Sequence, residues 1–186
     1  MRIRPRVTRF IQPIGSGLAR MGMTATAMTV LGLLVCVAGA ALIASGDLRG
    51  GAIVVLFGSL LDGLDGAVAR ASNKVSERGA FLDAAFDRIS EIAAFGGLAF
   101  AMEGSPRILL LIVLALGGAM LVPYFRAKAE ASGLDGRGGM MGRAERILLF
   151  CAGLITGYVE HMLWVFVILV WLTAFSRFWN TYRSIP

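Results

Sequence analysis

Long runs of apolar residues, separated by short charged stretches, dominate the pattern along this chain. A helix needs about 20 mostly apolar residues to cross the hydrocarbon of a membrane. Residues 21–46 carry no charge and hold one such run, at 26–45, and the uncharged stretch 108–125 is a second. Four shorter apolar runs reach this length only when charged residues are included at one end: 50–61, 92–102, 147–159 and 162–176. The pattern therefore predicts an all-α protein with six transmembrane helices.

The first twenty residues have an amphipathic pattern instead. Five apolar residues recur there at helical spacing, with arginines on the other faces: Val7, Phe10, Ile11, Ile14 and Leu18. Helices of this kind lie in the membrane interface, on anionic headgroups. We therefore expect residues 1–20 to form an N-terminal interfacial amphipathic helix and residues 21–186 to form a six-helix bundle, together making one membrane domain over 1–186.

Composition and charge favour a membrane protein over a soluble one. Hydrophobic residues make up 57% of the 186 and charged residues 16%, against about 45–50% and about 25% in soluble domains. The net charge of +6 does not indicate nucleic-acid binding, because no basic stretch is interleaved with aromatic residues that could stack on bases. All basic residues except Arg49 and Arg107 lie in or beside the two termini and the segments 71–78 and 126–146. Because cytoplasmic loops retain Lys and Arg, both termini are expected in the cytoplasm.

Four aspartates gather at the cytoplasmic ends of two neighbouring predicted helices. Asp62 and Asp65 are three residues apart, and Asp83 and Asp87 are four apart, so each pair shares one helix face. Converging carboxylates repel one another unless cations balance them, and an all-oxygen ligand set favours Mg²⁺ or Mn²⁺ over zinc. We therefore expect a divalent-metal site. A buried ion-pair network with nearby arginines, or the ion site of a small cation transporter, are the alternatives.

Fixed residues around these aspartates make the pattern more specific. The segment reads Asp62-x-x-Asp65-Gly66-x-x-Ala69-Arg70, then eight residues, then Gly79-x-x-x-Asp83-x-x-x-Asp87. It resembles, at every defining position, the signature of the CDP-alcohol phosphotransferase family. The resemblance implies a six-span membrane enzyme that transfers a phosphatidyl-type group from a CDP-lipid, such as CDP-diacylglycerol, to an alcohol and releases CMP. It also implies a homodimer.

The same resemblance implies a role for each residue of the motif. Asp87 would act as the general base that takes the proton of the alcohol. Four residues would bind two Mg²⁺ or Mn²⁺ ions: Asp62, Asp65, Asp83 and Asp87. Four others would contact the CDP-lipid: Gly66, Ala69, Arg70 and Gly79. Thr24 and Thr29, on the preceding helix, are expected to satisfy helix backbone groups rather than to approach the nucleotide.

The segment 126–146 holds five basic residues and is the candidate acceptor site. A positive-inside loop is the alternative explanation of these residues, whereas a pocket for a phosphorylated alcohol would use the planar fork of arginine. The run Arg126-Ala-Lys-Ala-Glu-Ala-Ser-Gly and the ending Arg143-Ala-Glu-Arg146 are similar to those of prokaryotic phosphatidylinositol-phosphate synthases, a branch of the family whose acceptor is inositol 1-phosphate. This implies a prokaryotic cell membrane and phosphate binding by Arg126, Arg143 and Arg177, with glycerol 3-phosphate as the alternative acceptor.

Overall fold

The computed structural model describes residues 13, 15–72, 76–136 and 138–185. Within these ranges the secondary structure is helical and contains no strand, which confirms the predicted all-α class. The helices are α2 (Ala25–Ala44), α3 (Leu48–Asp62), α4 (Asp65–Ala71), α5 (Glu77–Ala101), α6 (Pro106–Ala131), α7 (Arg143–Thr156) and α8 (Val159–Ser184).

Polar residues fix where several of these helices begin. The side chains of Thr24, Asp47 and Ser76 precede α2, α3 and α5, and each accepts a hydrogen bond from a backbone N–H in the first turn (2.9–3.1 Å). Such caps each contribute about 1 kcal/mol to helix stability. At its C-terminal end α7 is followed by Gly157, whose φ of +81° is in the left-handed region that glycine adopts without strain.

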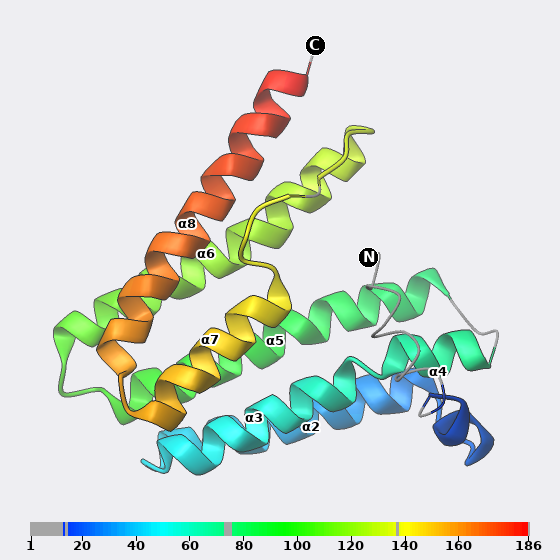
Figure 1. The fold of residues 1–186 in the computed structure, drawn as a ribbon, viewed down its shortest axis with the longest axis horizontal. Helices are drawn as coiled ribbons and strands as arrows, with labels where there is room; N and C mark the ends of the chain where they lie inside the picture. The colour runs from blue at the N-terminus through cyan, green and yellow to red at the C-terminus, as the bar shows by residue number, and fades with distance from the viewer. Residues whose placement is uncertain (1–12, 14, 73–75, 137, 186) are drawn as a thin grey trace.

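The helices form two groups joined by α7 (Figure 1). In the first group, α2 packs against both α3 and α5; in the second, α6 packs against α8. α7 packs against α3 on one side and α8 on the other. The short connections at 45–47, 102–105 and 157–158 lie toward one end of the molecule, at the left of Figure 1, and α4 and the beginning of α5 lie at the opposite end.

Glycines allow the helices of the first group to approach closely. A Cβ added at Gly32 of α2 would lie 2.7 Å from Asp62 Cβ and 2.9 Å from the carbonyl oxygen of Gly58, both on α3. A Cβ at Gly97 of α5 would lie 2.3 Å from the carbonyl oxygen of Ala40 on α2. Larger residues would therefore force α2 away from its two neighbours.

Four helical stretches are long and apolar enough to cross a membrane: Ala25–Ala44, Leu48–Ala71, Pro106–Ala131 and Val159–Ser184. They correspond to four of the six predicted spans and support a membrane protein. α5 is long enough at 25 residues, but its first half carries several charges, and α7 has only 14 residues. Most of the predicted interfacial helix, residues 1–12 and 14, lies outside the described residues, and residues 15–20 are helical.

Candidate active site

A break in the second span places the first two aspartates on different helices. α3 ends at Asp62, a turn follows at Gly63 and Leu64, and α4 begins at Asp65. The single helical face expected for Asp62 and Asp65 is therefore interrupted between them. Asp65 accepts hydrogen bonds from the backbone N–H of Gly66 and from the hydroxyl of Thr29, whose oxygen lies 3.0 Å from Asp65 Oδ2.

Three aspartates from two helices, α3 and α5, converge at one point. One carboxylate oxygen from each of Asp62, Asp83 and Asp87 lies within 4.8 Å of the others, and Asp62 is only 3% exposed. Three hard oxygen donors converging from α3 and α5 are a donor set that suits Mg²⁺ or Mn²⁺. The residues present therefore fit a divalent metal at this cluster, which we call the aspartate cluster (Asp62, Asp83 and Asp87).

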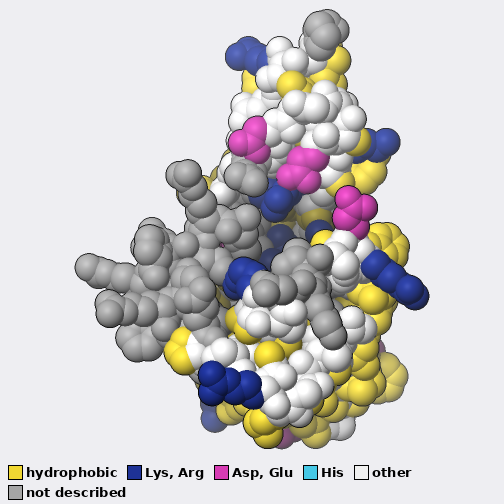
Figure 2. All heavy atoms as spheres, turned by 90° about the vertical axis from the view of Figure 1, so that its right-hand side faces the viewer, with side chains coloured by type: hydrophobic (Ala, Val, Ile, Leu, Met, Phe, Trp, Pro, Cys, Tyr) yellow, Lys and Arg dark blue, Asp and Glu magenta, His cyan; other side chains and the backbone are white. Residues whose placement is uncertain are grey.

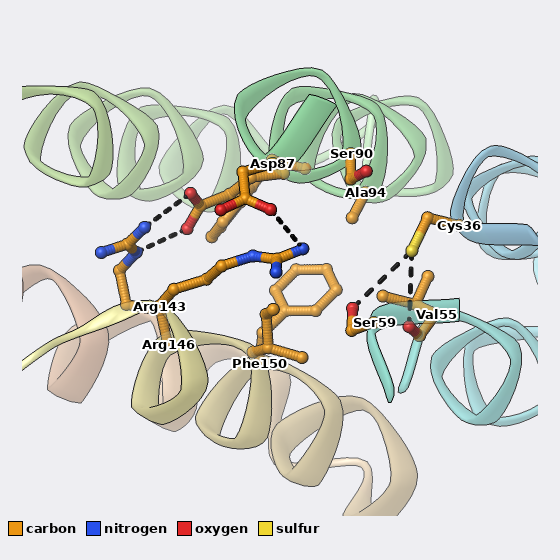
Figure 3. A pocket seen from close by; sticks show the side chains of 12 residues that line it. Cys36, Val55, Ser59, Asp87, Ser90, Ala94, Arg143, Arg146 and Phe150 are labelled. Atoms are coloured by element: carbon orange, nitrogen blue, oxygen red, sulfur yellow. Dashed lines mark hydrogen bonds and ion pairs between the residues drawn. The ribbon is translucent and has the colours of Figure 1, made fainter. Parts of the chain in front are cut away.

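Arg143, the first residue of α7, binds the aspartate cluster directly. Its Nη1 lies 2.6 Å from Asp62 Oδ2 and its Nη2 lies 2.7 Å from Asp87 Oδ1; Figure 3 shows the second of these contacts. The guanidinium thus offsets one of the three negative charges. Arg143 was predicted to hold the phosphate of the acceptor, and in the structure it contacts Asp87, the predicted base, directly.

A cavity of about 360 Å³ lies beside the cluster. Its volume is in the range of small-molecule binding pockets, about 300–1,000 Å³. The four residues predicted to contact the CDP-lipid all line it, together with two of the aspartates: Gly66, Ala69, Arg70, Gly79, Asp65 and Asp83. Since Asp83 belongs to both, the cavity opens directly onto the aspartate cluster.

Sequence reasoning missed part of this cavity wall. Thr26, Thr29 and Ser76 also line it. Thr24 caps α2, as expected of a residue that satisfies backbone groups. Thr29 has a double role, because its hydroxyl lies 3.0 Å from the carbonyl oxygen of Ala25 as well as from Asp65. The only signal in the sequence was a threonine within a long apolar run, which does not reveal a partner 36 residues away.

The other two predicted acceptor arginines are bound elsewhere. Arg126 forms an ion pair one turn along its own helix, with Glu130 (2.8 Å). Arg177, on α8, donates from Nε to the carbonyl oxygen of Gly138 and from Nη1 to that of Val122, both at 2.9 Å. Of the three, only Arg143 contacts the aspartate cluster. Figure 2 shows the molecule from the end that holds α4 and the beginning of α5, where Lys and Arg side chains gather around a central hollow.

A second ion pair lies one turn deeper between the same two helices. Arg146 of α7 binds Glu91 of α5 through two contacts, Nε–Oε1 at 2.6 Å and Nη2–Oε2 at 2.9 Å. This pair and Asp87 line a small cavity of about 20 Å³, together with residues of α2 and α3 such as Cys36 and Ser59 (Figure 3). The sequence pattern assigned no role to Glu91 or Arg146.

Comparisons with known proteins agree with the motif. A family model described as CDP-alcohol phosphatidyltransferase matches residues 22–179. A phosphatidylinositol phosphate synthase of Mycobacterium marinum is 40% identical over 177 residues, which cover 92% of this chain and 76% of that protein. An archaetidylinositol phosphate synthase of Methanothermobacter thermautotrophicus is 37% identical over 183 residues, 98% of this chain and 90% of that protein.

Solved structures extend the similarity to the fold. The crystal structure of Mycobacterium tuberculosis phosphatidylinositol phosphate synthase with CDP-DAG bound superposes with a TM-score of 0.86 at 34% identity, covering 94% of each chain. The structure of the same enzyme in complex with manganese and citrate gives a TM-score of 0.85 at 34% identity, covering 92% of this chain and 88% of that one.

Proposed function

The chain belongs to the CDP-alcohol phosphatidyltransferase family, and we propose that it transfers a phosphatidyl-type group from a CDP-lipid to inositol 1-phosphate and releases CMP. One observation carries the proposal. The cavity lined by Gly66, Ala69, Arg70 and Gly79 opens through Asp83 onto the aspartate cluster, and Arg143 lies on the other side of that cluster. Nucleotide, metal and acceptor functions thus meet at one place.

The cavity suits the CDP part of the donor lipid. Gly66 and Gly79 leave space in it that a side chain would fill. A Cβ at Gly66 would lie 3.3 Å from Arg70 Nη1, and one at Gly79 would lie 3.2 Å from Ser76 Oγ. Arg70, on the last turn of α4, can offer its guanidinium fork to a phosphate. We infer that the cytidine and pyrophosphate bind here, with the lipid tails toward the membrane.

The four aspartates are proposed to hold two divalent cations. Asp62, Asp83 and Asp87 supply the converging carboxylates, and Asp65, oriented by Thr29 and by the backbone of Gly66, completes the set from the cavity side. Bound divalent cations neutralise a pyrophosphate and stabilise attacking and leaving oxygens. Mg²⁺ and Mn²⁺ both match an all-oxygen site.

Asp87 is the proposed general base. In the transfer, the acceptor hydroxyl oxygen forms a bond to the lipid-side phosphorus while the bond from that phosphorus to the CMP oxygen breaks, and CMP leaves with the electron pair. The hydroxyl proton passes to the Asp87 carboxylate. Asp87 is suited to this because its carboxylate lies 2.7 Å from Arg143 Nη2, beside which a phosphorylated alcohol would be held.

Arg126, Arg143 and Arg177 are proposed to bind the phosphate of the acceptor. Inositol 1-phosphate must approach a site that already holds a pyrophosphate, so cations are needed to offset the repulsion between the two anions. Arg143 is the nearest, with its side chain 27% exposed. Arg177 anchors the loop that leads to α7 through Gly138, and so it brings a second guanidinium to the same face of the bundle.

The proposed placement in the membrane follows from the helix ends. We infer that α5 and α7 also cross the membrane, giving six spans, and that residues 1–20 lie on its cytoplasmic surface. The aspartate cluster and most basic residues then face the cytoplasm, with both termini, in the cell membrane of a prokaryote. The short connections at 45–47, 102–105 and 157–158 lie outside. The single domain 1–186 is proposed to work as a homodimer.

An acceptor screen scored by CMP release tests the function. The purified enzyme is incubated with a CDP-lipid and Mg²⁺, together with inositol 1-phosphate, free inositol or glycerol 3-phosphate. Inositol 1-phosphate is expected to be the preferred acceptor and free inositol a poor one. Equal use of free inositol would refute the phosphate pocket, and a preference for glycerol 3-phosphate would refute the acceptor while leaving the chemistry intact. Diacyl and archaeal ether CDP-lipids, compared in parallel, identify the donor.

A further inference from the structure

Two ion pairs connect α5 and α7 like successive rungs of a ladder. Asp87 and Glu91 are one turn apart on α5, and Arg143 and Arg146 are one turn apart on α7. The outer rung, Asp87–Arg143, belongs to the proposed active site. The inner rung, Glu91–Arg146, is buried, with side chains 9% and 6% exposed.

The inner rung is built more rigidly than the outer one. Its two parallel N–O contacts, at 2.6 and 2.9 Å, form a bidentate pair, which fixes orientation as well as distance. Arg146 Nη1 also donates to the carbonyl oxygen of Met141 at 3.3 Å, and Met141 N–H donates to the hydroxyl of Thr173 on α8 at 3.2 Å. Arg146 therefore ties the segment leading into α7 to both α5 and α8.

The beginning of α7 needs such an anchor. No side chain caps it, since its first flanking residue is Gly142, and α7 packs mainly on α3 and α8 rather than on α5. Arg143, at the first position of the helix, must nevertheless meet Asp87 of α5. Stability alone does not explain the inner rung, because an apolar pair of similar volume is often as stable as a buried ion pair or more so.

We propose that Glu91 and Arg146 are positioning residues, which hold α7 in register with α5 so that Arg143 stays between Asp62 and Asp87. The inference rests on the proposed function of Arg143 at the active site. It assigns no contact with substrate to Glu91 or Arg146.

Loosening the inner rung tests the inference. Arg146→Lys keeps the charge but replaces the fork by a point contact, and Glu91→Gln removes the charge. Because a misplacement of about 1 Å can cost about a hundredfold, each variant is expected to raise the KM for inositol 1-phosphate at least about tenfold. The KM for the CDP-lipid should stay within about twofold of the wild-type value. If Glu91→Gln does not yield folded protein, Arg146→Lys carries the test alone.

Repeating the variants without Arg143 separates positioning from a general structural effect. In an Arg143→Ala background, or Arg143→Lys if turnover is too low, loosening the inner rung is expected to add no further rise in acceptor KM. The same fold-change in both backgrounds, or no change in either, would overturn the inference. Arg107→Gln is the control: it breaks a remote pair with Glu160 (3.0 Å) between α6 and α8, and it should leave both KM values unchanged.

Mn²⁺ affinity, measured by titration without substrates, keeps this inference distinct from the proposed acceptor site. Arg143 and a divalent cation compete for the same carboxylates, so Glu91→Gln and Arg146→Lys are expected to tighten Mn²⁺ binding at least about threefold by loosening Arg143. In the Arg143→Ala background the same substitutions should not change the Mn²⁺ affinity. If Arg143→Ala leaves the acceptor KM unchanged, the proposed acceptor role fails while this readout still judges the positioning. A Mn²⁺ affinity insensitive to Glu91→Gln and Arg146→Lys would overturn the positioning.

Discussion

The close packing of α2 against α3 at Asp62 can be tested by adding one methyl group at Gly32. Gly32→Ala adds a Cβ that would lie 2.7 Å from Asp62 Cβ, 2.9 Å from the Gly58 carbonyl oxygen and 3.0 Å from the Asp62 nitrogen. Ordinary contact begins at 3.4 Å, so the helices must separate by 3.4 minus 2.7, or 0.7 Å, at the level of Asp62. Backbone atoms make up two of the three contacts, and no side-chain rotation can relieve them.

The expected cost is small in stability and large in function. Overpacking typically costs about 1–3 kcal/mol, and Ala regains about 1 kcal/mol over Gly in a helix interior. The free energy of unfolding should therefore fall by no more than about 2 kcal/mol. Since a displacement of about 1 Å can cost about a hundredfold in rate, the shift of Asp62 is expected to lower kcat at least about tenfold and to weaken Mn²⁺ binding.

Two further glycines provide matched controls. At Gly96 an added Cβ meets nothing within 4 Å, so Gly96→Ala should leave kcat unchanged and raise the melting temperature slightly. At Gly97 it would meet the Ala40 carbonyl oxygen at 2.3 Å, a comparable clash far from the cluster. Gly97→Ala should lower the melting temperature with little change in Mn²⁺ affinity. CMP release, Mn²⁺ titration and thermal unfolding are measured on all three; a Gly32→Ala enzyme that matches Gly96→Ala in kcat and Mn²⁺ affinity would refute the reasoning.

Further substitutions address the rest of the site. Asp87→Asn should lower kcat about 10²–10⁴-fold, as expected for loss of a general base, with a smaller effect on CDP-lipid binding; a parallel loss of binding would make Asp87 mainly a metal ligand. Arg143→Ala and Arg177→Ala should raise the KM for inositol 1-phosphate about tenfold to a hundredfold, the equivalent of about 1.5–3 kcal/mol, and unchanged KM values would refute the phosphate pocket. Ala69→Leu should narrow the 360 Å³ cavity and raise the KM for the CDP-lipid without changing that for the acceptor; the reverse result would place the nucleotide elsewhere. Three neutralising changes should each abolish CMP release at saturating Mg²⁺ while the protein still purifies folded, and substantial activity in all three would place the metal elsewhere: Asp62→Asn, Asp65→Asn and Asp83→Asn.

Local spacing predicted that Asp83 and Asp87 share one helix face, and the family resemblance supplied the four residues that line the cavity. Gly66 and Arg70 are one turn apart on α4, whereas Asp62 and Gly79 belong to other helices, so spacing along one helix accounts for only part of the site. The four apolar helices were predictable because length and composition decide whether a helix can span a membrane. α5 was harder to judge, since the charges that serve the site are the ones that reduce its apolar character.

Contacts between distant segments could not be predicted in this way. Nothing local to Arg143 shows that its guanidinium lies between Asp62 and Asp87, 81 and 56 residues earlier in the chain. The sequence analysis gave Arg146 only as the last residue of the ending Arg143-Ala-Glu-Arg146 and gave Glu91 no role, and it is the packing of α7 against its neighbours that brings the two together. The break at Gly63 was also hidden, because most glycines in the described helices, such as Gly32 and Gly58, do not interrupt them.

The nucleotide cavity has a further consequence for how enzymes of this kind can diversify. Among the residues that the structure describes, those that line it come from between Ala25 and Asp83, whereas the arginines proposed for the acceptor lie between Arg126 and Arg177. Under the proposed function, the first half of the polypeptide recognises the CDP-lipid donor, and the second half recognises the acceptor alcohol. The two halves are joined by the ion pairs of Arg143 with Asp62 and Asp87, and by the pair of Arg146 with Glu91. A gene fusion that joins residues 1–103 to the second half of a relative with another acceptor should therefore exchange the alcohol and retain the CDP-lipid, provided that these ion pairs are preserved.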